Sequence, residues 1–377
     1  MKRFFSSIFF SCIALSNTSF AEVGVTDSTI KLGQSAALTG PASELGTEMR
    51  DGANAYFESV NRKGGVNGRK IQLISMDDGY EPARTIANTK KLIDEEKVLA
   101  LFGYVGTPTS KEAIPIFTAA KVPFIGAFTG AELLRTPVNH YIMNVRASYF
   151  DETEKIVRQL TSLGMKNIAV FYQNDAYGKA GLTGVEQAMN RRNLKIISTG
   201  TFERNTTDVS TAVNTIAKSN PQAVVMIGAY KACAEYIRQS KKAGMNSVQF
   251  FNVSFVGSRA LAAELGADGR GVAVSQVVPF PWNTANAIVK EYQEGMKQFS
   301  QSGYSFTSLE GFIAAKVLVE GMKRAGKDLT REKLIIAMES MSKHEMSGFY
   351  VDYSPTDHNA SNFVDITIIG KDGKFQH

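Results

Sequence analysis

The fold is indicated by residues 98–130, VLALFGYVGTPTSKEAIPIFTAAKVPFIGAFTG, which contain two strand-and-turn units in succession. The apolar run at residues 98–102 is typical of a parallel strand that is buried on both faces. Thr107 stands directly before Pro108, a pair that favours a helix start with Thr107 as its N-cap and a helix to about residue 120. The stretch therefore begins as a β-strand, a glycine-rich turn and an α-helix.

The second unit repeats the first. Residues 122–125 predict the next strand, and residues 126–130 predict a second turn from strand to helix. In open α/β folds, such turns lie at the carboxyl edge of one sheet, where ligands bind. Free backbone N–H groups, a helix N-terminus and the hydroxyls of Thr107 and Thr129 would together suit an anion. The alternative, that both threonines are ordinary N-caps without a ligand, stays open.

The first residues predict a secretory signal peptide over residues 1–21. Lys2 and Arg3 precede an apolar core at residues 4–15, and Ser19-Phe20-Ala21 is a small-x-small cleavage site. No later segment is apolar enough to cross a membrane. We therefore expect a periplasmic protein that does not itself span a membrane, with a mature chain from residue 22 that is long enough for two domains.

Cysteine and charge usage narrow the class of protein. Cys233 is the only cysteine beyond the predicted signal peptide, so no intrachain disulfide is expected. The formal charge of +6 is dispersed along the chain, whereas a nucleic-acid surface needs a concentrated basic patch. No nucleic-acid partner is expected.

Catalytic signatures are missing from the sequence. We find no G-x-S-x-G, no G-x-x-x-x-G-K-[ST] and no H-E-x-x-H, and the four histidines have no partners at ligand spacing. We therefore expect no enzyme, no cofactor and no metal. An exported chain of this kind is typical of a binding protein that closes on a small ligand.

Strands alternate with helices along most of the chain, which predicts an α/β fold with parallel sheets. A second strand–helix series follows residues 141–146, an extended segment that we interpret as a crossover between two lobes. Its strands are expected at 168–172, 195–199, 223–227 and 247–252. The tail at 348–375 is hairpin-like, with a turn at Asp372-Gly373.

Six motifs, in this order and spacing, resemble the type I periplasmic binding proteins of the leucine/isoleucine/valine-binding family, which deliver ligands to ABC transporters. The motifs are IKLGQSAALTGPASELG (30–46), NRKGGVNGRKIQL (61–73), MDDGYEP (76–82), LFGYVGTPTS (101–110), PFIGAFTGAELL (123–134) and FYQNDAYGKAGL (171–182). The resemblance covers nearly all of the mature chain.

This resemblance implies two doubly wound parallel-sheet lobes joined by three crossovers. We place the crossovers near residues 144–147, 277–279 and 347–350. Lobe one is then residues 22–145 plus 280–346, and lobe two is residues 146–278 plus 347–377.

The resemblance also implies a ligand site. Thr107, Ala127 and Thr129 match the residues that hold the α-carboxylate and ammonium of the ligand. From lobe two, Tyr177 and Tyr230 match the tyrosines that close over it.

Two further positions depart from the family pattern. Leu45 stands where an aromatic residue is common, and Ser254 stands where an acidic residue commonly pairs with the ligand ammonium. Because an unpaired buried ammonium is costly, the amine needs another partner or is absent. Glu235 and Asp175 are candidate substitutes.

The leading functional prediction is an extracytoplasmic binding component of an ABC importer. It would capture a small apolar amino acid by its carboxylate between the lobes and deliver it to an inner-membrane ABC permease. A carboxylate ligand without an amine is the alternative ligand, and a ligand-sensing partner of a membrane receptor is the alternative role.

Overall fold

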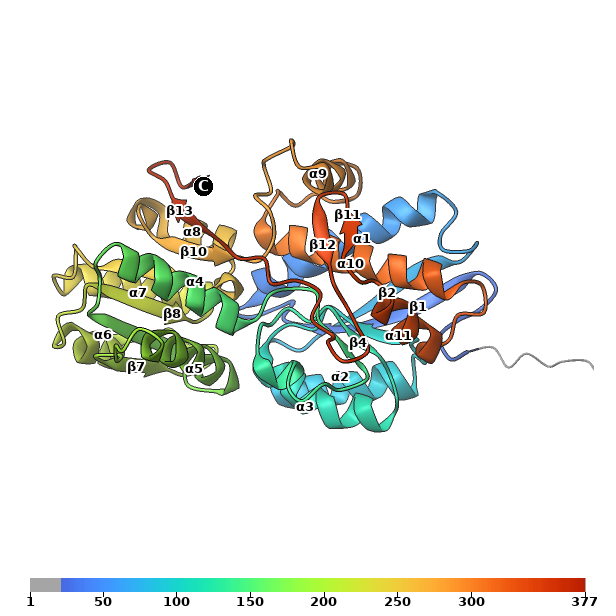
Figure 1. The fold of residues 1–377 in the computed structure, drawn as a ribbon, viewed down its shortest axis with the longest axis horizontal. Helices are drawn as coiled ribbons and strands as arrows, with labels where there is room; N and C mark the ends of the chain where they lie inside the picture. Colours follow the sequence, from blue (N-terminus) through green and yellow to red (C-terminus); the bar gives the residue numbers. More distant parts are fainter. Residues whose placement is uncertain (1–21, 377) are drawn as a thin grey trace, which may run out of the picture.

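The computed structural model describes residues 22–376, so the predicted signal peptide lies outside the described residues. Two separate α/β bodies follow one another along the long axis of the molecule, and the chain passes between them near the middle (Figure 1). We call them lobe one and lobe two. Within residues 22–376, we find no helix long and apolar enough to cross a bilayer.

Lobe one contains a five-stranded sheet in the order β2-β1-β3-β4-β5, and all of its strands are parallel. The strands are β1 (Thr29–Ala36), β2 (Lys70–Asp77), β3 (Ala100–Phe102), β4 (Phe124–Ile125) and β5 (Ile142–Met143). The helices packed in this lobe are α1 (Ser43–Arg62), α2 (Pro82–Asp94), α3 (Thr107–Ala119), α9 (Ala287–Phe299), α10 (Phe306–Ala325) and α11 (Arg331–Glu339).

Lobe two contains a seven-stranded sheet in the order β14-β13-β10-β9-β8-β6-β7. Its parallel strands are β6 (Ile168–Gln173), β7 (Thr199–Phe202), β8 (Ala223–Ile227), β9 (Gln249–Asn252) and β10 (Ala273–Gln276). The tail adds an antiparallel hairpin at one edge, β13 (Asp365–Ile369) and β14 (Phe375–Gln376), as the sequence predicts. The helices are α4 (Tyr149–Ser162), α5 (Ala176–Asn190), α6 (Ser210–Ala217), α7 (Tyr230–Lys242) and α8 (Ser258–Leu265).

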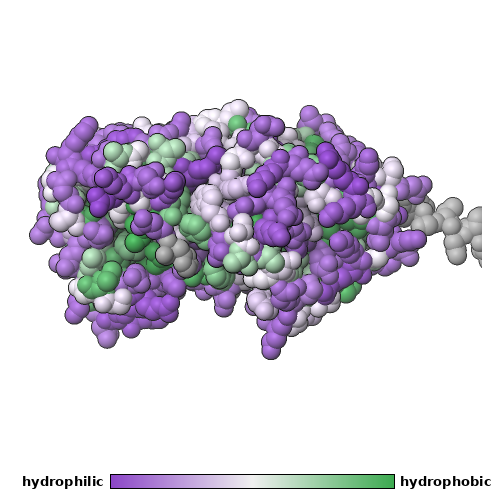
Figure 2. Space-filling view, turned by 90° about the horizontal axis from the view of Figure 1, so that it is seen from above, coloured by the Kyte–Doolittle hydropathy of each residue, from purple (hydrophilic) through white to green (hydrophobic). Residues whose placement is uncertain are grey.

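These two sheets confirm the predicted fold class, a two-lobed α/β protein. The lobe limits at residues 145–146 and 278–280 stay predictions. Three short 3-10 turns complete the description: η1 (Glu132–Leu134), η2 (Ser254–Val256) and η3 (Gly266–Gly269). Figure 2 shows a mainly hydrophilic face, with hydrophobic side chains gathered over one half of the molecule.

The third crossover was predicted in the wrong place. Residues 347–350 belong to a hairpin of β11 (His344–Met346) and β12 (Phe349–Val351). Ser347 and Gly348 both have positive φ, 57° and 90°, as the two central residues of a type I′ hairpin turn require. Ala360 still donates its N–H to Asn144 O in lobe one, so the chain crosses to lobe two between Ala360 and β13.

Close backbone contact joins α1 to α10 in the core of lobe one. A Cβ atom at Gly52 would lie 1.7 Å from the carbonyl oxygen of Ser308, and one at Gly311 would lie 2.1 Å from that of Met49. Neither distance is possible for a real side chain, so the two helices can approach this closely only because both residues are glycines.

Replacing Gly52 by alanine is therefore expected to lower the free energy of unfolding by about 1–3 kcal/mol, the usual cost of overpacking. The gain of about 1 kcal/mol in helix propensity does not compensate for a displaced helix. Urea denaturation measures the change. Gly303→Ala is the control, because its nearest atom would be Arg259 Nη1 at 3.6 Å, an ordinary contact. Equal stability of the two variants would contradict the prediction.

Candidate functional site

The two glycine-rich turns lie side by side, as predicted. Val105 and Phe128 form a parallel bridge, and Gly106 donates its N–H to Phe128 O at 3.2 Å. The Oγ1 atoms of Thr107 and Thr129 are 2.6 Å apart and hydrogen-bonded, and both side chains are fully buried. The adjacent strands β3 and β4 hold this pair together, because each turn follows directly from its strand.

The threonines are not helix N-caps, which corrects part of the sequence interpretation. Gly106, with φ 99° and ψ 154°, is the N-cap of α3, and Thr107 is the first helical residue. The second turn leads into the three-residue turn η1 and not into an α-helix. Thr129 Oγ1 accepts the Ala131 N–H at 3.4 Å and also bonds the Tyr149 hydroxyl at 3.2 Å. The hydroxyls therefore face one another and Tyr149, the first residue of α4 in lobe two.

Ala127 shapes the second turn through its backbone, while its side chain packs in the core. Its methyl group packs in the smaller apolar cluster of lobe one, with Tyr104 and Phe124. Its carbonyl accepts the Thr129 N–H at 2.9 Å and so shapes the second turn.

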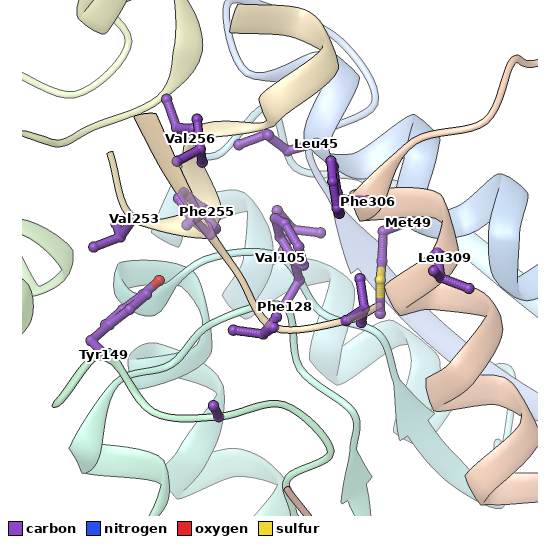
Figure 3. Close-up of a cluster of buried hydrophobic side chains, with 14 of the residues drawn as sticks. Leu45, Met49, Val105, Phe128, Tyr149, Val253, Phe255, Val256, Phe306 and Leu309 are labelled. Carbon is purple, nitrogen blue, oxygen red and sulfur yellow. The ribbon is translucent and has the colours of Figure 1, made fainter. Parts of the chain in front are cut away.

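Aromatic rings from both lobes meet at the junction between the lobes, where Figure 3 shows Phe255 near Phe128. Phe255, in η2 of lobe two, lies between Phe128 of lobe one, at a ring-centroid distance of 5.2 Å, and Tyr177 at 4.6 Å. Its ring is also 5.9 Å from that of Tyr80, which follows β2. Tyr177 is fully buried in the first turn of α5, and its hydroxyl has no hydrogen-bond partner among the described residues.

Tyr230 and Leu45 meet at another part of the junction between the lobes. Tyr230 begins α7, and its hydroxyl bonds Ser43 and the backbone of Glu44 at the start of α1. Leu45 lies in the same first turn, and a Cβ atom at Gly257 of lobe two would come within 2.5 Å of its Cδ2. Tyr177, Tyr230 and Leu45 therefore lie at the junction, and their role in ligand binding stays a prediction.

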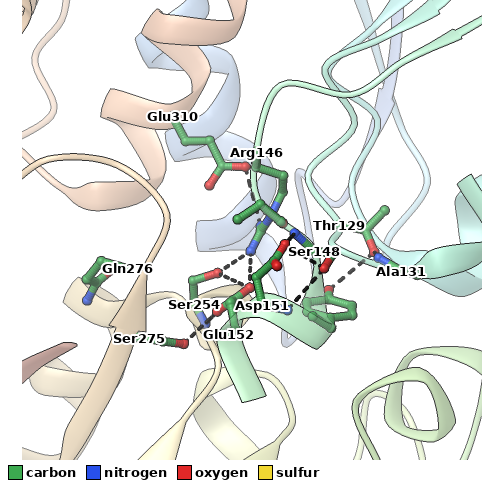
Figure 4. A network of polar contacts seen from close by, with 12 residues as sticks. Thr129, Ala131, Arg146, Ser148, Asp151, Glu152, Ser254, Ser275, Gln276 and Glu310 are labelled. Atoms are coloured by element: carbon green, nitrogen blue, oxygen red, sulfur yellow. Dashed lines mark hydrogen bonds and ion pairs between the residues drawn. The ribbon is translucent and has the colours of Figure 1, made fainter. Parts of the chain in front are cut away.

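Ser254 belongs to a buried polar network that the sequence reading missed (Figure 4). Its hydroxyl bonds the guanidinium of Arg146, in the first crossover, and the carboxylate of Glu152, on α4, at 3.0 Å. Glu152 also accepts Arg146 Nη2 at 2.6 Å, Ser254 N at 2.7 Å and Ser275 Oγ at 2.5 Å. Each oxygen of Glu152 therefore accepts two hydrogen bonds, which fills its acceptor capacity.

Arg146 links this network to lobe one. Its Nη1 lies 3.3 Å from Oε1 of Glu310 on α10. Burial lowers the pKa of Arg146, but Glu310 and Glu152 together outweigh that effect and raise it. Burial raises the pKa of Glu310 to about 7, against the opposing charge of Arg146. The guanidinium also lies 5.4 Å from the centre of the Phe128 ring, so the charged group and the aromatic rings share one region.

The two carboxylates suggested as substitutes for a missing acid are both engaged elsewhere. Asp175 caps α5, accepting the Tyr177 N–H at 2.9 Å, and also accepts Gln173 Nε2 at 2.6 Å. Glu235 is about one-third exposed and pairs with Arg238 on its own helix. The hydrogen bonds of Ser254 go instead to Arg146 and Glu152.

Two charged contacts also join the lobes. Arg204 of lobe two pairs with Glu81 of lobe one at 3.0 Å, and Arg259 pairs with Glu48 at 2.7 Å. With the ring contacts, they show that side chains of the two lobes contact one another at several points of the junction.

The fold is that of two α/β lobes whose polar and aromatic side chains meet at one junction. Residues 29–374 match the model of the family described as "Periplasmic binding protein". The chain belongs to this family.

Individual relatives agree with this assignment. A solved structure of a possible leucine/isoleucine/valine-binding protein from Rhodopirellula baltica is 38% identical, with a TM-score of 0.89 over 93% of this chain and 96% of that one. The leucine-, isoleucine-, valine-, threonine- and alanine-binding protein of Pseudomonas aeruginosa is 23% identical over 83% of each chain. A fatty acid ABC transporter substrate-binding protein from Thermomonospora curvata has the same fold, with a TM-score of 0.83, at 22% identity over 94% of this chain and 92% of that one.

Proposed function

We propose that this protein is the periplasmic substrate-binding component of an ABC importer and that it captures a small apolar amino acid between its lobes. The observation that carries the proposal is the hydrogen-bonded pair Thr107–Thr129 at the ends of two adjacent strands. Two such turns offer hydroxyl and backbone N–H donors, which suit a ligand carboxylate.

The aromatic side chains supply the other half of the proposed site. Phe255 of lobe two contacts Phe128 of lobe one and Tyr177 of its own lobe, so an apolar ligand side chain here would meet rings from both lobes. The names of the relatives from Rhodopirellula and Pseudomonas support ligands of this class. The delivery partner would be an inner-membrane ABC permease.

A carboxylate ligand without an amine is the second candidate. This candidate is favoured because Ser254 carries no negative charge that could pair with an amine. The carboxylate that bonds Ser254, Glu152, already accepts hydrogen bonds from Arg146, Ser254 and Ser275. Such a ligand would need no anionic partner in the site.

A thermal-shift screen of the purified protein against the twenty amino acids and their 2-oxo and 2-hydroxy analogues tests the proposal. A ligand at 100 times its Kd stabilises by about 2.7 kcal/mol, which is readily measured. We expect shifts with leucine, isoleucine, valine or another apolar amino acid. Shifts with the deaminated acids alone would favour the second candidate, and no shift with either set would reject both.

Small-angle scattering supplies a second test of the same proposal. Because residues of both lobes have to meet around the ligand, we expect the radius of gyration to fall when a hit from the screen is added. Identical profiles with and without saturating ligand would contradict closure of the lobes on the ligand.

A further inference from the structure

Glu310 is the incompletely paired carboxylate of the buried network. It is 5% exposed, and among the described residues its only hydrogen bond is the 3.3 Å contact of Oε1 with Arg146 Nη1. Arg146 is shared, since its Nη2 makes the much shorter 2.6 Å contact with Glu152. One buried carboxylate is thus fully hydrogen-bonded, while the other has a single long contact with a cation that is already engaged.

Glu310 stands one helical turn before a residue that packs against the second glycine turn. Ala314, one helical turn further along α10, packs against the start of the second glycine turn: a Cβ atom at Gly126 would lie 3.0 Å from Ala314 Cβ. Residues four apart lie on the same helix face, so Glu310 projects from that face, toward Arg146 and the aromatic region. Figure 4 shows Glu310 on the side of Arg146 opposite Ser254 and Glu152.

We propose that Glu310 accepts the ligand ammonium, so that the amine is bound from lobe one and not from the Ser254 position in lobe two. This inference rests on the proposed amino-acid function and extends it, because it names a primary amine as part of the ligand and the residue that selects for it. A buried carboxylate with one long hydrogen bond is stabilised by a second cation, and an ammonium supplies that charge with three donors. Glu152 cannot take this role while its four hydrogen bonds persist.

The proposed contact has a defined proton linkage. Burial raises the pKa of Glu310 to about 7, and the charged groups that face it are Arg146, Arg135 and Glu152. Both arginines stay protonated at neutral pH, because the pKa of Arg135 falls only to about 10 on burial and the pKa of Arg146 is raised by Glu310 and Glu152. An ammonium favours the ionised carboxylate, so binding should lower the pKa of Glu310 and release a proton below about pH 7. A deaminated acid should have the opposite effect.

The test is isothermal titration calorimetry with L-leucine, L-valine and 4-methyl-2-oxopentanoate on the unmodified protein, Glu310→Gln and Glu320→Gln. We expect Glu310→Gln to weaken the binding of the amino acids about 10- to 100-fold, since a hydrogen bond to a charged group is lost. The affinity for the oxo acid should not fall. Glu320→Gln is the matched control, because Glu320 lies on the same helix and pairs with Arg324. This variant should change neither the affinity for the amino acids nor the affinity for the oxo acid.

Proton release on the unmodified protein keeps the inference testable if Glu310→Gln does not fold. Leucine titrations at pH 6.5 in buffers of different ionisation enthalpy should show proton release. Amino-acid binding that Glu310→Gln leaves unchanged, or that releases no proton, would overturn the inference and leave the proposed function intact. If neither leucine, valine nor any other amino acid bound the unmodified protein, the proposed function itself would fail.

Discussion

Replacing Arg146 by methionine is expected to lower the free energy of unfolding by about 3–5 kcal/mol, the cost of breaking a buried ion pair from one side. The guanidinium is buried and contacts the carboxylates of Glu152 at 2.6 Å and Glu310 at 3.3 Å. Methionine fills a similar volume without charge, so the loss would come from two carboxylates left without a cation. Chemical denaturation at pH 8 measures it.

The loss in free energy of unfolding caused by Arg146→Met should be smaller at low pH. Without Arg146, burial raises the pKa of Glu310 further above its ordinary value, so the carboxyl is neutral in the folded state at pH 6 and its burial is then inexpensive. A group whose pKa is raised on folding destabilises the protein as the pH rises through the range between the unfolded and folded values. The difference between Arg146→Met and the unmodified protein should therefore grow from pH 6 to pH 8.

Arg191→Met is the control for Arg146→Met. Arg191 pairs with Glu154 at 2.5 Å, which is as short as the Arg146 contact, but the arginine side chain is about half exposed. Exposed pairs contribute about 0–1 kcal/mol, so the control should lose no more than that. If the two variants lost the same free energy of unfolding, the buried negative charges of Glu152 and Glu310 would not depend on Arg146 for their stabilisation.

The sequence predicted the features that depend on local pattern. The apolar run at residues 98–102 and the pair Thr107-Pro108 led to a strand and a helix start that the structure places at β3 and α3. The adjacency of Thr107 and Thr129 followed from a rule about parallel strands, and the 2.6 Å contact agrees with it. These features could be predicted because each depends on residues that are close together in the sequence.

Features that depend on distant residues could not be predicted in the same way. Arg146, Glu152 and Glu310 stand in a crossover and on two helices, and no spacing in the sequence links them. The position of Glu152, however, could have been inferred from a local motif. Ser148 and Asp151 form a capping box that marks the start of α4, so Glu152 could have been placed in its first turn.

Two errors came from turns. The Ser347-Gly348 pair was taken for a crossover, although both residues adopt positive φ in a two-residue hairpin turn. Thr107 was taken for a cap because it precedes Pro108, whereas Gly106 adopts the cap conformation and leaves the threonine hydroxyl free for Thr129. In both cases a glycine beside a polar residue determined the backbone, because positive φ costs glycine little.

Replacing Thr107 by valine is expected to weaken ligand binding by about 1.5–3 kcal/mol, roughly 10- to 100-fold, because one hydrogen bond to a charged group is lost. Valine keeps the shape of threonine, so the packing of the two turns should survive. The Thr129 hydroxyl would lose its 2.6 Å partner but keep its 3.2 Å contact with Tyr149. Calorimetry with the strongest hit of the amino-acid screen measures the change.

Thr109→Val supplies the matched control for Thr107→Val. Thr109 lies two residues further along the first turn of α3 and is also fully buried, but its hydroxyl bonds the carbonyls of Val105 and Gly106 in its own turn. Losing those bonds should lower stability by about 0.5–1.5 kcal/mol and leave the affinity within a few-fold. If Thr107→Val bound as tightly as the unmodified protein, the Thr107 hydroxyl would serve only to hold Thr129. The carboxylate would then have to be held by the backbone N–H groups of the two turns alone.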